Sequence, residues 1–449
     1  MSGIAGVAAR GRVAEVASML EVLSHRGPKG MQVFECGEAT LGSVSAVAKA
    51  PAWDEALGVV RDETGPGRFA CATSGGEGLV LSRDPLGAAP LYLGKLADGT
   101  LAFASEVKAL LGRAEGIREL PPGSRWEGGA VRRASALAVQ PERHEPAEVL
   151  ARELRQRLEG VVARAMERGP AGSWLSGGLD SSVMVALARP HVPRFHTFAG
   201  GLAHASDLPY AREVASFLKT EHHEVVLTLE RLKQLLPDVV ASLESFDALL
   251  VRSSVVNHLV AEAAAQHVDA VFSGEGGDEL FGGYAYLKDL PLVQLPAELV
   301  DITGRLHNTA LQRVDRSASR HGLAVHTCFL EPEVVELALR VPAAFKIHDG
   351  IEKWILRKAL EGRLPESVLW RPKAKFWEGA GVASLLAELA DAEVSDDDFR
   401  LQRRLDNGWI LDSKEELLNY RHFRERFGEL ADLDWMGRTK GRPSAAELA

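Results

Sequence analysis

Residues 65–110 alternate short apolar runs with Gly and Asp. The segments RFACATS, GLVLSRD, APLYLGKL and LAFASE each have the length of a strand, and turn-forming residues separate them. This pattern predicts an antiparallel sheet. RELPPGSRW (118–126) is typical of a turn, and the weakly patterned VQPERHEPAEV (139–149) of a linker. We therefore expect a first domain over residues 1–145.

The pattern changes after the linker to strands that alternate with helices. GSWLSGG, RFHTFAG, HHEVVL and VDAVFSG are predicted strands, and SSVMVALAR, DLPYAREVASFLK and SSVVNHLVAEAAAQH are the helices between them. This order predicts a parallel sheet with helices on both faces and a ligand site at the carboxyl ends of its strands. Residues 295–430 have a mostly helical pattern. We expect a second domain over 146–435 and a flexible tail over 436–449.

Composition narrows the class of protein. The chain has 449 residues, 46% of them hydrophobic, and a net charge of −10, which argues against a nucleic-acid partner. Its three cysteines are Cys36, Cys71 and Cys328, too few and too far apart for a disulfide framework or a Cys-rich zinc site. The sequence has neither a signal-peptide pattern nor an apolar run of membrane-spanning length. We expect a soluble, cytoplasmic protein without a membrane partner.

The segment SGGLDSS, residues 176–182, follows a predicted strand and opens a predicted helix. Gly177 and Gly178 allow close approach of the backbone to a phosphate, and the helix N-terminus supplies free N–H groups. The serine hydroxyls add donors, whereas Asp180 would repel a phosphate unless it holds Mg²⁺. The simpler interpretation is a Gly-rich turn with a capping serine. The full heptapeptide in this context favours a nucleotide phosphate loop.

A second Gly-rich segment, FSGEGGDELFGGY (272–284), ends another predicted strand at the same sheet edge. It carries Glu275, Asp278 and Glu279. These carboxylates would be ordinary surface charges if they stood alone. Beside a phosphate loop, Asp278 is well placed to complete a Mg²⁺ site with Asp180, and Glu275 to act as a general base.

Together these two motifs resemble those of the glutamine-dependent asparagine synthetases. DLPYAREVASFLKTEHHEV, RHGLAVHTCFLEP and EKWILRKALEGRLPESVLWRPKAKFWEGAG match that family in sequence and order. The N-terminal third agrees through MSGIAG, HRGPKG and RDPLGAAPLYLGKLADGTLAFASEVKALL. The resemblance covers nearly the whole chain. It implies an α/β protein with an N-terminal Ntn-type antiparallel α/β sandwich, as in class II glutamine amidotransferases, and a C-terminal parallel-sheet ATP pyrophosphatase domain.

The resemblance also implies a reaction. The enzyme would adenylate a carboxylate such as aspartate with ATP and Mg²⁺, release pyrophosphate and transfer the acyl group to an amine. By position, Asp180 and Asp278 would hold Mg²⁺-pyrophosphate, Glu275 would take a proton from the attacking ammonia, and Lys373 would stabilise developing charge. Lys375 is a weaker candidate for that role. ATP would be bound by Leu175, Ser176, Gly177, Gly178, Asp180, Ser181, Ser182, Ser273 and Gly274.

The N-terminal domain departs from the family pattern. The family's nucleophile is the cysteine of MCGI, and Ser2 stands in its place. A serine hydroxyl ionises less readily than a thiol, although N-terminal serine can be activated by its own amine. No Asn precedes Asn257, so the Asn of the family's oxyanion hole is missing, and SVSAVAKA (43–50) replaces its glutamine-binding segment. We therefore predict that the domain is structural and that Ser2 is a degenerate nucleophile position.

A second departure concerns the acyl substrate. GLAVHTCFL replaces a segment close to GLEARVPFL, so Ala324, His326 and Cys328 stand where the family has Glu, Arg and Pro. His326 and Cys328 are interpreted as core residues, or as signs of an altered pocket. A relative of β-lactam synthetase is an alternative, but that family has Tyr where Glu275 stands. A nucleotide-binding pseudoenzyme is a third possibility. A homodimer is a further expectation.

Overall fold

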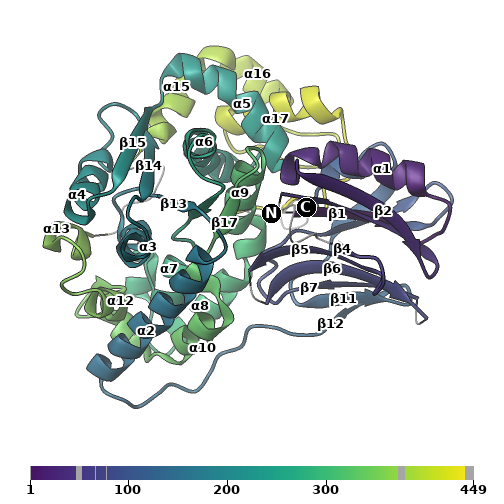
Figure 1. Cartoon of the computed structure of the whole chain (residues 1–449). Coiled ribbons are helices and arrows are strands. Elements are labelled where there is room, and N and C mark those ends of the chain that lie inside the picture. The colour runs from purple at the N-terminus through teal and green to yellow at the C-terminus, as the bar shows by residue number, and fades with distance from the viewer. Residues whose placement is uncertain (1, 47–52, 66, 77, 373–379, 440–449) are drawn as a thin grey trace.

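The computed structural model describes residues 2–46, 53–65, 67–76, 78–372 and 380–439. Two parts of the chain lie side by side (Figure 1). The first consists of two stacked antiparallel sheets, and the second is built around a parallel sheet. This is the mixed α/β architecture expected from the sequence.

The two N-terminal sheets enclose an apolar core. Their strand orders are β10-β8-β9-β1-β3-β2 and β12-β11-β7-β6-β5-β4. Alternate side chains such as Ile4 and Phe103 meet Val60 and Leu81 of the facing sheet. Helix α1 (Val13–Val22) packs on the outer side of the first sheet. The strands are β1 (Ser2–Val7), β2 (Gly30–Cys36), β3 (Ala39–Ser45), β4 (Trp53–Asp54), β5 (Val59–Gly65), β6 (Arg68–Gly75), β7 (Gly78–Arg83), β8 (Tyr92–Leu96), β9 (Leu101–Ala104), β10 (Ala114–Glu119), β11 (Ser124–Glu127) and β12 (Ala130–Arg133).

The second part has a parallel sheet of order β15-β14-β13-β16-β17. Its strands are β13 (Ala171–Trp174), β14 (His196–Gly201), β15 (Glu221–Val226), β16 (Ala270–Phe272) and β17 (Ala324–His326). Four of them were expected from the sequence. β17 lies inside the region that we expected to be mostly helical. It is only three residues long, so its pairing with β16, not its own periodicity, makes it a strand.

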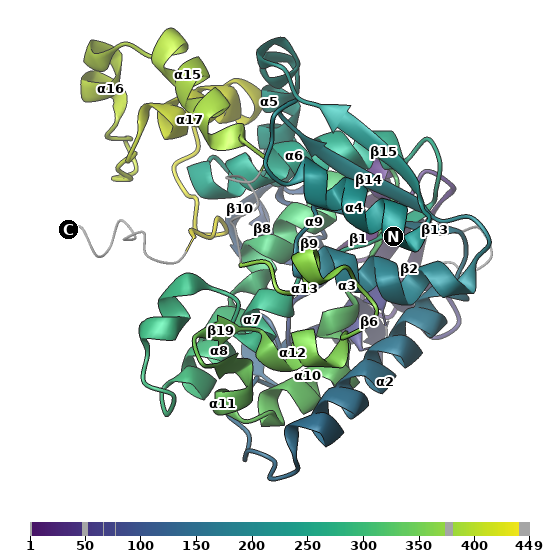
Figure 2. The same cartoon turned by 90° about the vertical axis from the view of Figure 1, so that its left-hand side faces the viewer.

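Helices cover both faces of this sheet (Figure 2). One layer contains α2 (Ala147–Met166), α3 (Leu179–Ala188) and α4 (Leu208–Leu218), which pack on Leu175 and Phe272. The other contains α5 (Leu229–Leu243), α6 (Ala248–Ala264) and α9 (Ala310–Ser319), which pack on Trp174 and Phe198. The remaining elements are α7 (Gly277–Phe281), α8 (Leu295–Gly304), α10 (Pro332–Arg340), α11 (Ala343–Lys346), β18 (Ile347–His348), β19 (Ile351–Glu352), α12 (Trp354–Ala359), α13 (Glu366–Leu369), α15 (Val382–Glu393), α16 (Asp396–Gln402) and α17 (Lys414–Phe427).

A buried ion network joins the two parts. The guanidinium of Arg26, from the first part, donates to both carboxylate oxygens of Asp315 on α9, at 2.7 and 2.9 Å. It also pairs with Asp62 at 3.0 Å and Glu106 at 2.8 Å. Arg316, the next residue of α9, reaches back to Glu106 at 3.3 Å. Because these groups are withdrawn from water, each charge depends on its partners, and the pairs Arg26–Asp315 and Arg316–Glu106 cross between the two parts.

Two domain boundaries were predicted from the sequence, one after residue 145 and one after residue 435. β12 ends at Arg133 and α2 begins at Ala147, with neither helix nor strand between them. Thr439 Oγ1 donates to Asp247 Oδ1 at 3.0 Å, and Arg438 pairs with Glu416 at 2.6 Å. The packed chain therefore continues four residues into the expected tail, and residues 440–449 lie outside the described residues. Among the described helices, none is long and apolar enough to span a membrane.

Candidate active site

A cavity of about 210 Å³ opens at the carboxyl ends of β13, β14 and β16, beside α6 and α9. Both Gly-rich motifs reach it. The expected site residues that line it are Leu175, Ser176, Gly178, Asp180, Ser181, Ser273, Gly274, Glu275 and Asp278. Gly177 and Ser182 belong to the same loop and helix start without lining the cavity. The sheet topology thus brings together residues separated by about a hundred positions in sequence.

The predicted phosphate loop, residues 176–182, is constrained by close packing of its backbone and by hydrogen bonds of its own serines. Gly177 has φ +76°, and a Cβ built on it would lie 2.6 Å from the backbone nitrogen of Ala211. Only glycine fits there. The hydroxyls of Ser176 and Ser181 lie 3.0 Å apart, and Ser182 Oγ donates to the Gly178 carbonyl at 2.8 Å. The loop leads directly into α3. The first N–H groups of that helix have no acceptor within the helix, so they are available to an anion.

The two candidate metal ligands converge on one buried lysine. Lys353 Nζ lies 2.5 Å from Asp180 Oδ2 and 2.5 Å from Asp278 Oδ1, and its side chain is 1% exposed. The two carboxylate oxygens are therefore no more than 5 Å apart. Sequence reasoning missed Lys353, because a lysine within EKWILRK has the appearance of a solvated helix charge. Its position among matching family residues was the available signal.

Glycines make room for this carboxylate pair. A Cβ on Gly277 would lie 2.4 Å from Asp180 Oδ1, and one on Gly283 would lie 2.0 Å from Asp278 Oδ1. A side chain at either position would displace an acidic group. Two carboxylates from adjacent strand ends form an oxygen donor set of the kind that Mg²⁺ takes, with phosphate oxygens and water completing the octahedron. The residues present fit a Mg²⁺-nucleotide.

The candidate general base has a cationic partner. Glu275 forms an ion pair with Arg313 of α9, and both side chains line the cavity. Nearby, Tyr284 donates a hydrogen bond to Glu279. Burial, reinforced by the neighbouring charge of Asp278, raises the pKa of Glu279 to about 7. Sequence reasoning missed Arg313, because α9 lies far from both motifs in sequence.

One wall of the cavity is apolar and was not expected from the motifs. Trp174 and Phe198 come from the sheet, and Val256 and Val260 come from α6. Asn257 also lines the cavity and is 4% exposed. Its Oδ1 accepts no hydrogen bond from any described residue. A flat apolar wall with one polar acceptor is suited to a heteroaromatic base that carries an amino group.

Lys373 and Lys375 lie outside the described residues. The described residues on either side of this segment contact the carboxyl edge. Arg371 donates to the Gly177 carbonyl at 3.2 Å and pairs with Asp207 at 2.6 Å. On the other side, the Ala380 carbonyl accepts from Leu202 N at 2.9 Å.

Ser2 lies in the first part, away from this cavity. It is 6% exposed, and its Oγ donates to Asp62 Oδ1 at 3.0 Å. Burial raises the pKa of Asp62, against the opposing charge of Arg26. The Ser2 carbonyl accepts from Arg26 Nε at 2.8 Å. Ser2 is therefore bound into the buried ion network between the two parts. Residues 47–50 of SVSAVAKA lie outside the described residues.

His326 and Cys328 are both buried and do not line the cavity. His326 packs against the ring of Phe272 at 5.1 Å between centroids, and burial lowers its pKa to about 3. Burial likewise raises the pKa of the Cys328 thiol to about 12. Both residues belong to the core, which is the simpler of the two interpretations drawn from the sequence.

Comparison with known proteins places this architecture in a family. A model described as asparagine synthase matches residues 153–302 and 294–446, and one described as glutamine amidotransferase domain matches 58–122. Asparagine synthetase B [glutamine-hydrolyzing] of Escherichia coli (strain K12) is 34% identical over 408 residues, which cover 84% of this chain and 70% of that protein. The chain belongs to the asparagine synthase family. The resemblance drawn from the sequence is thereby confirmed.

Other members of the asparagine synthase family give the same result. The probable asparagine synthetase of Dictyostelium discoideum is 34% identical over 360 residues, covering 71% of this chain and 64% of that protein. The Schizosaccharomyces pombe protein of the same name is 34% identical over 390 residues, covering 78% and 70%. The matched part thus spans roughly two thirds of the length of these curated relatives. The glutamine amidotransferase match begins at β5 and does not include Ser2.

Proposed function

We propose that this member of the asparagine synthase family is an ATP-dependent ligase that adenylates the side-chain carboxylate of aspartate or a related acid. It then releases pyrophosphate and forms an amide with ammonia that it does not obtain from its own glutaminase. The observation that carries the proposal is the single cavity in which the phosphate loop, the pair Asp180–Asp278 and the pair Glu275–Arg313 meet.

The adenylation half of the reaction is supported by the loop and the carboxylates. The N–H groups at the start of α3 and the loop serines bind phosphate oxygens, and the apolar wall receives adenine beside Asn257. Asp180 and Asp278 would hold Mg²⁺, which offsets phosphate charge while pyrophosphate leaves. Lys353 pairs with the same two carboxylates, and its ammonium group would offset phosphate charge if pyrophosphate leaves beside them.

The amide-forming half depends on Glu275. Ammonia becomes a better nucleophile toward an acyl-adenylate when a carboxylate accepts its proton during attack. The guanidinium of Arg313 fixes the orientation of the Glu275 carboxylate from α9. Lys373 is proposed to stabilise negative charge on the α-phosphate and on the tetrahedral intermediate.

Three observations support an N-terminal part without glutaminase activity. Ser2 stands where the family has cysteine, and no Asn occurs before residue 257. The Ser2 hydroxyl is already engaged with Asp62, whose carboxylate is shared with Arg26. Ser2 thus supports Asp62 and Arg26, and Arg26 reaches Asp315 of the second part.

The test separates adenylation from amination and ammonia from glutamine. Exchange of labelled pyrophosphate into ATP is measured with aspartate and related acids, and amide formation is then measured with ammonium or glutamine. We expect exchange with one acid, amide formation with ammonium, and no glutamate release from glutamine. Asp180→Asn and Asp278→Asn should abolish exchange, whereas the exposed control Asp349→Asn should keep it. Glutamine turnover that matches amide formation would refute the ammonia assignment, and an absence of exchange with every acid would refute the ligase.

A further inference from the structure

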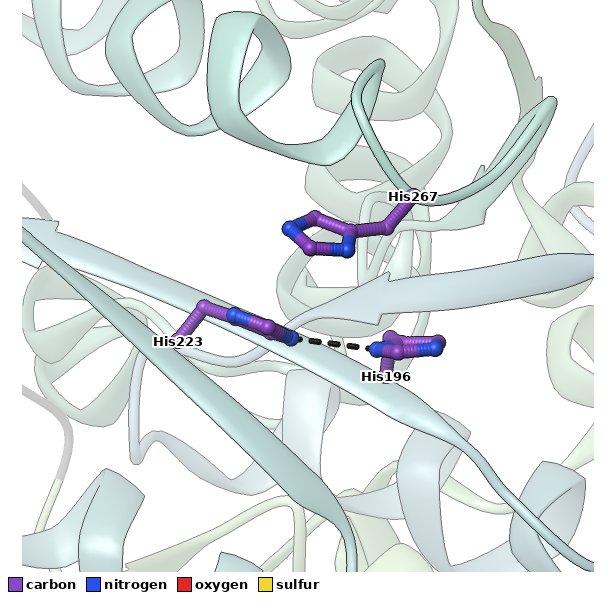
Figure 3. A group of neighbouring side chains, drawn as sticks. All are labelled: His196, His223 and His267. Carbon is purple, nitrogen blue, oxygen red and sulfur yellow. Dashed lines mark hydrogen bonds between the residues drawn. The ribbon is translucent and has the colours of Figure 1, made fainter.

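Three histidines outside the candidate active site meet near the amino ends of the strands of the parallel sheet. His196 is the first residue of β14, His223 lies in β15 opposite Phe198, and His267 lies between α6 and β16. One ring nitrogen of each histidine lies within 4.8 Å of those of the other two. Figure 3 shows the hydrogen-bonded rings of His196 and His223 with the ring of His267 above them. Three elements distant in sequence thus contribute one imidazole each.

The distances between the ring nitrogens are close to those between nitrogen ligands of one metal ion. His196 Nδ1 and His223 Nε2 lie 3.0 Å apart and share a hydrogen bond. The centroid of the His267 ring is 4.3 Å from that of His223 and 5.2 Å from that of His196. In a tetrahedral zinc site, bonds of about 2.0–2.1 Å separate ligand nitrogens by about 3.3 Å. The ring planes lie at 26–33° to one another, so the rings would have to turn, and His267 to move inward from the surface, to complete the geometry.

The chemistry of the cluster favours a borderline divalent metal. Neutral imidazole suits Zn²⁺, Ni²⁺ and Cu²⁺, whereas Mg²⁺ prefers oxygen. Glu221 Oε2 lies 3.6 Å from His196 Nδ1, and the same carboxylate is paired with Arg194.

We propose that His196, His223 and His267 form a site for one divalent transition-metal ion, with a fourth position open to water. The site is separate from the candidate active site. Phe198 lies between them, since its buried ring lines the active-site cavity and stacks on His223 at 5.0 Å and 14°. The exposed ring of His267 leaves the site open to ions from solvent. The two sites select different ions, because one offers imidazoles and the other carboxylates.

The experiment measures Zn²⁺ binding to the full chain after tag removal and chelator treatment, by calorimetric titration in an excess of Mg²⁺. We expect one Zn²⁺ per chain, and with Co²⁺ as the probe the visible absorption of a four-coordinate nitrogen site. His196→Gln and His223→Gln should weaken Zn²⁺ binding by about 100-fold or more, since even outer partners of metal ligands contribute 10–100-fold. The His196→Gln and His223→Gln variants could fail to fold, so His267→Gln is included as well. The His267 side chain is exposed, and its loss should reduce Zn²⁺ affinity without unfolding the protein.

Matched controls distinguish the site from general histidine binding. His422→Gln replaces another half-buried histidine and His144→Gln another exposed one, and both should retain wild-type Zn²⁺ affinity. The proposal is overturned if the wild-type chain binds no stoichiometric Zn²⁺. It is also overturned if all three cluster variants bind Zn²⁺ as the wild type does, which would assign the ion to another place and leave the histidines as an aromatic stack.

Discussion

Lys353 holds together the two carboxylates on which the candidate metal site depends. Its backbone has φ +55° at the start of α12, which is uncommon for a residue with a side chain. Its ammonium group lies between Asp180 and Asp278, almost completely removed from water. Without a cation at this point, the two neighbouring carboxylates would repel each other. In the proposed function, a bound Mg²⁺ would take over from the lysine in offsetting the charge of this pair.

Replacing Lys353 by methionine should make folding depend on the metal. Breaking a buried ion pair costs about 3–5 kcal/mol, so Lys353→Met should lower the free energy of unfolding by about that amount in the absence of Mg²⁺. Added Mg²⁺ with pyrophosphate should restore part of the loss by binding the exposed carboxylate charges. Urea unfolding with and without these ligands measures both effects. Lys358→Met, in the same helix but near the surface, should change neither, and an equal loss in both variants would contradict the role given to Lys353.

Glu275→Gln should separate the two half-reactions. The amide side chain keeps much of the shape but cannot accept the proton of ammonia, so amide release should fall by about 10²–10⁴-fold. Exchange of pyrophosphate into ATP in the presence of the acid, which needs no proton acceptor for ammonia, should continue. Lys373→Ala should instead impair exchange itself, because charge on the α-phosphate develops in that step.

The control for this prediction is Glu336→Gln, which removes an exposed carboxylate of α10. It should leave both half-reactions unchanged. An equal loss of exchange and amide formation in Glu275→Gln would mean that Glu275 positions the substrate or the metal. Its assignment as a general base would then be wrong.

The turn between β13 and α3 illustrates how an element prepares a binding site. Its two glycines are neighbours in sequence, yet the structure uses them differently. Gly177 has a positive φ and touches the backbone at Asp207 and Ala211, which begin α4. Gly178 has φ −81°, and a Cβ there would approach only Ser176 Oγ, at 3.3 Å. The first glycine is therefore required by packing, and the second leaves open space for a ligand.

Alanine substitutions at these two positions should give different results. Gly177→Ala should destabilise the protein by about 2–5 kcal/mol, from backbone strain and a clash with α4. Gly178→Ala should leave stability within about 1 kcal/mol, since only a side-chain hydroxyl has to move. It should raise the KM for ATP if phosphate occupies this space. Thermal unfolding and initial rates measure the two effects, and similar stability losses in both variants would contradict the account of the turn.

At the scale of the whole molecule, the N-terminal part is fixed to the synthetase part by buried charges. Besides the network around Arg26, Glu119 of the first part pairs with Arg83 at 2.6 Å and with His307 of the second part at 2.9 Å. Burial opposes ionisation of Glu119, but Arg83 and His307 outweigh it and lower its pKa to about 2. The interface therefore stabilises the ionised carboxylate, and its contribution depends on pH.

Lowering the pH should reduce the free energy of unfolding as the Glu119 carboxylate is protonated. The pKa of Glu119 is lower in the folded state than its ordinary value of 4.5, so its stabilisation is complete above that value and is lost as the pH falls toward about 2. Glu119→Gln should reduce the free energy of unfolding at pH 7 by on the order of 2–3 kcal/mol. The difference from wild type should shrink between about pH 5 and pH 3 in urea unfolding series. A difference that stays constant with pH would show that Glu119 acts only by shape.

The sequence by itself determined the fold class, the family and most residues of the candidate site. Period-two and helical patterns predicted the antiparallel and parallel sheets, and the two Gly-rich motifs lie where strand–loop–helix geometry requires them. These predictions are possible because the spacing of glycines and the order of strands and helices can be seen in short stretches of sequence. The sequence also shows that the N-terminal part lacks the nucleophilic Cys and the oxyanion-hole Asn of the family.

Only the tertiary structure decided which residues complete the site from a distance. Lys353 and Arg313 resemble ordinary surface charges in sequence, and burial against Asp180, Asp278 and Glu275 gives them their roles. The strand β17 depends on its neighbour for pairing. The histidine cluster depends on three elements that meet near one end of the sheet. These features arise from contacts between segments far apart in sequence, and local patterns contain no information about such contacts.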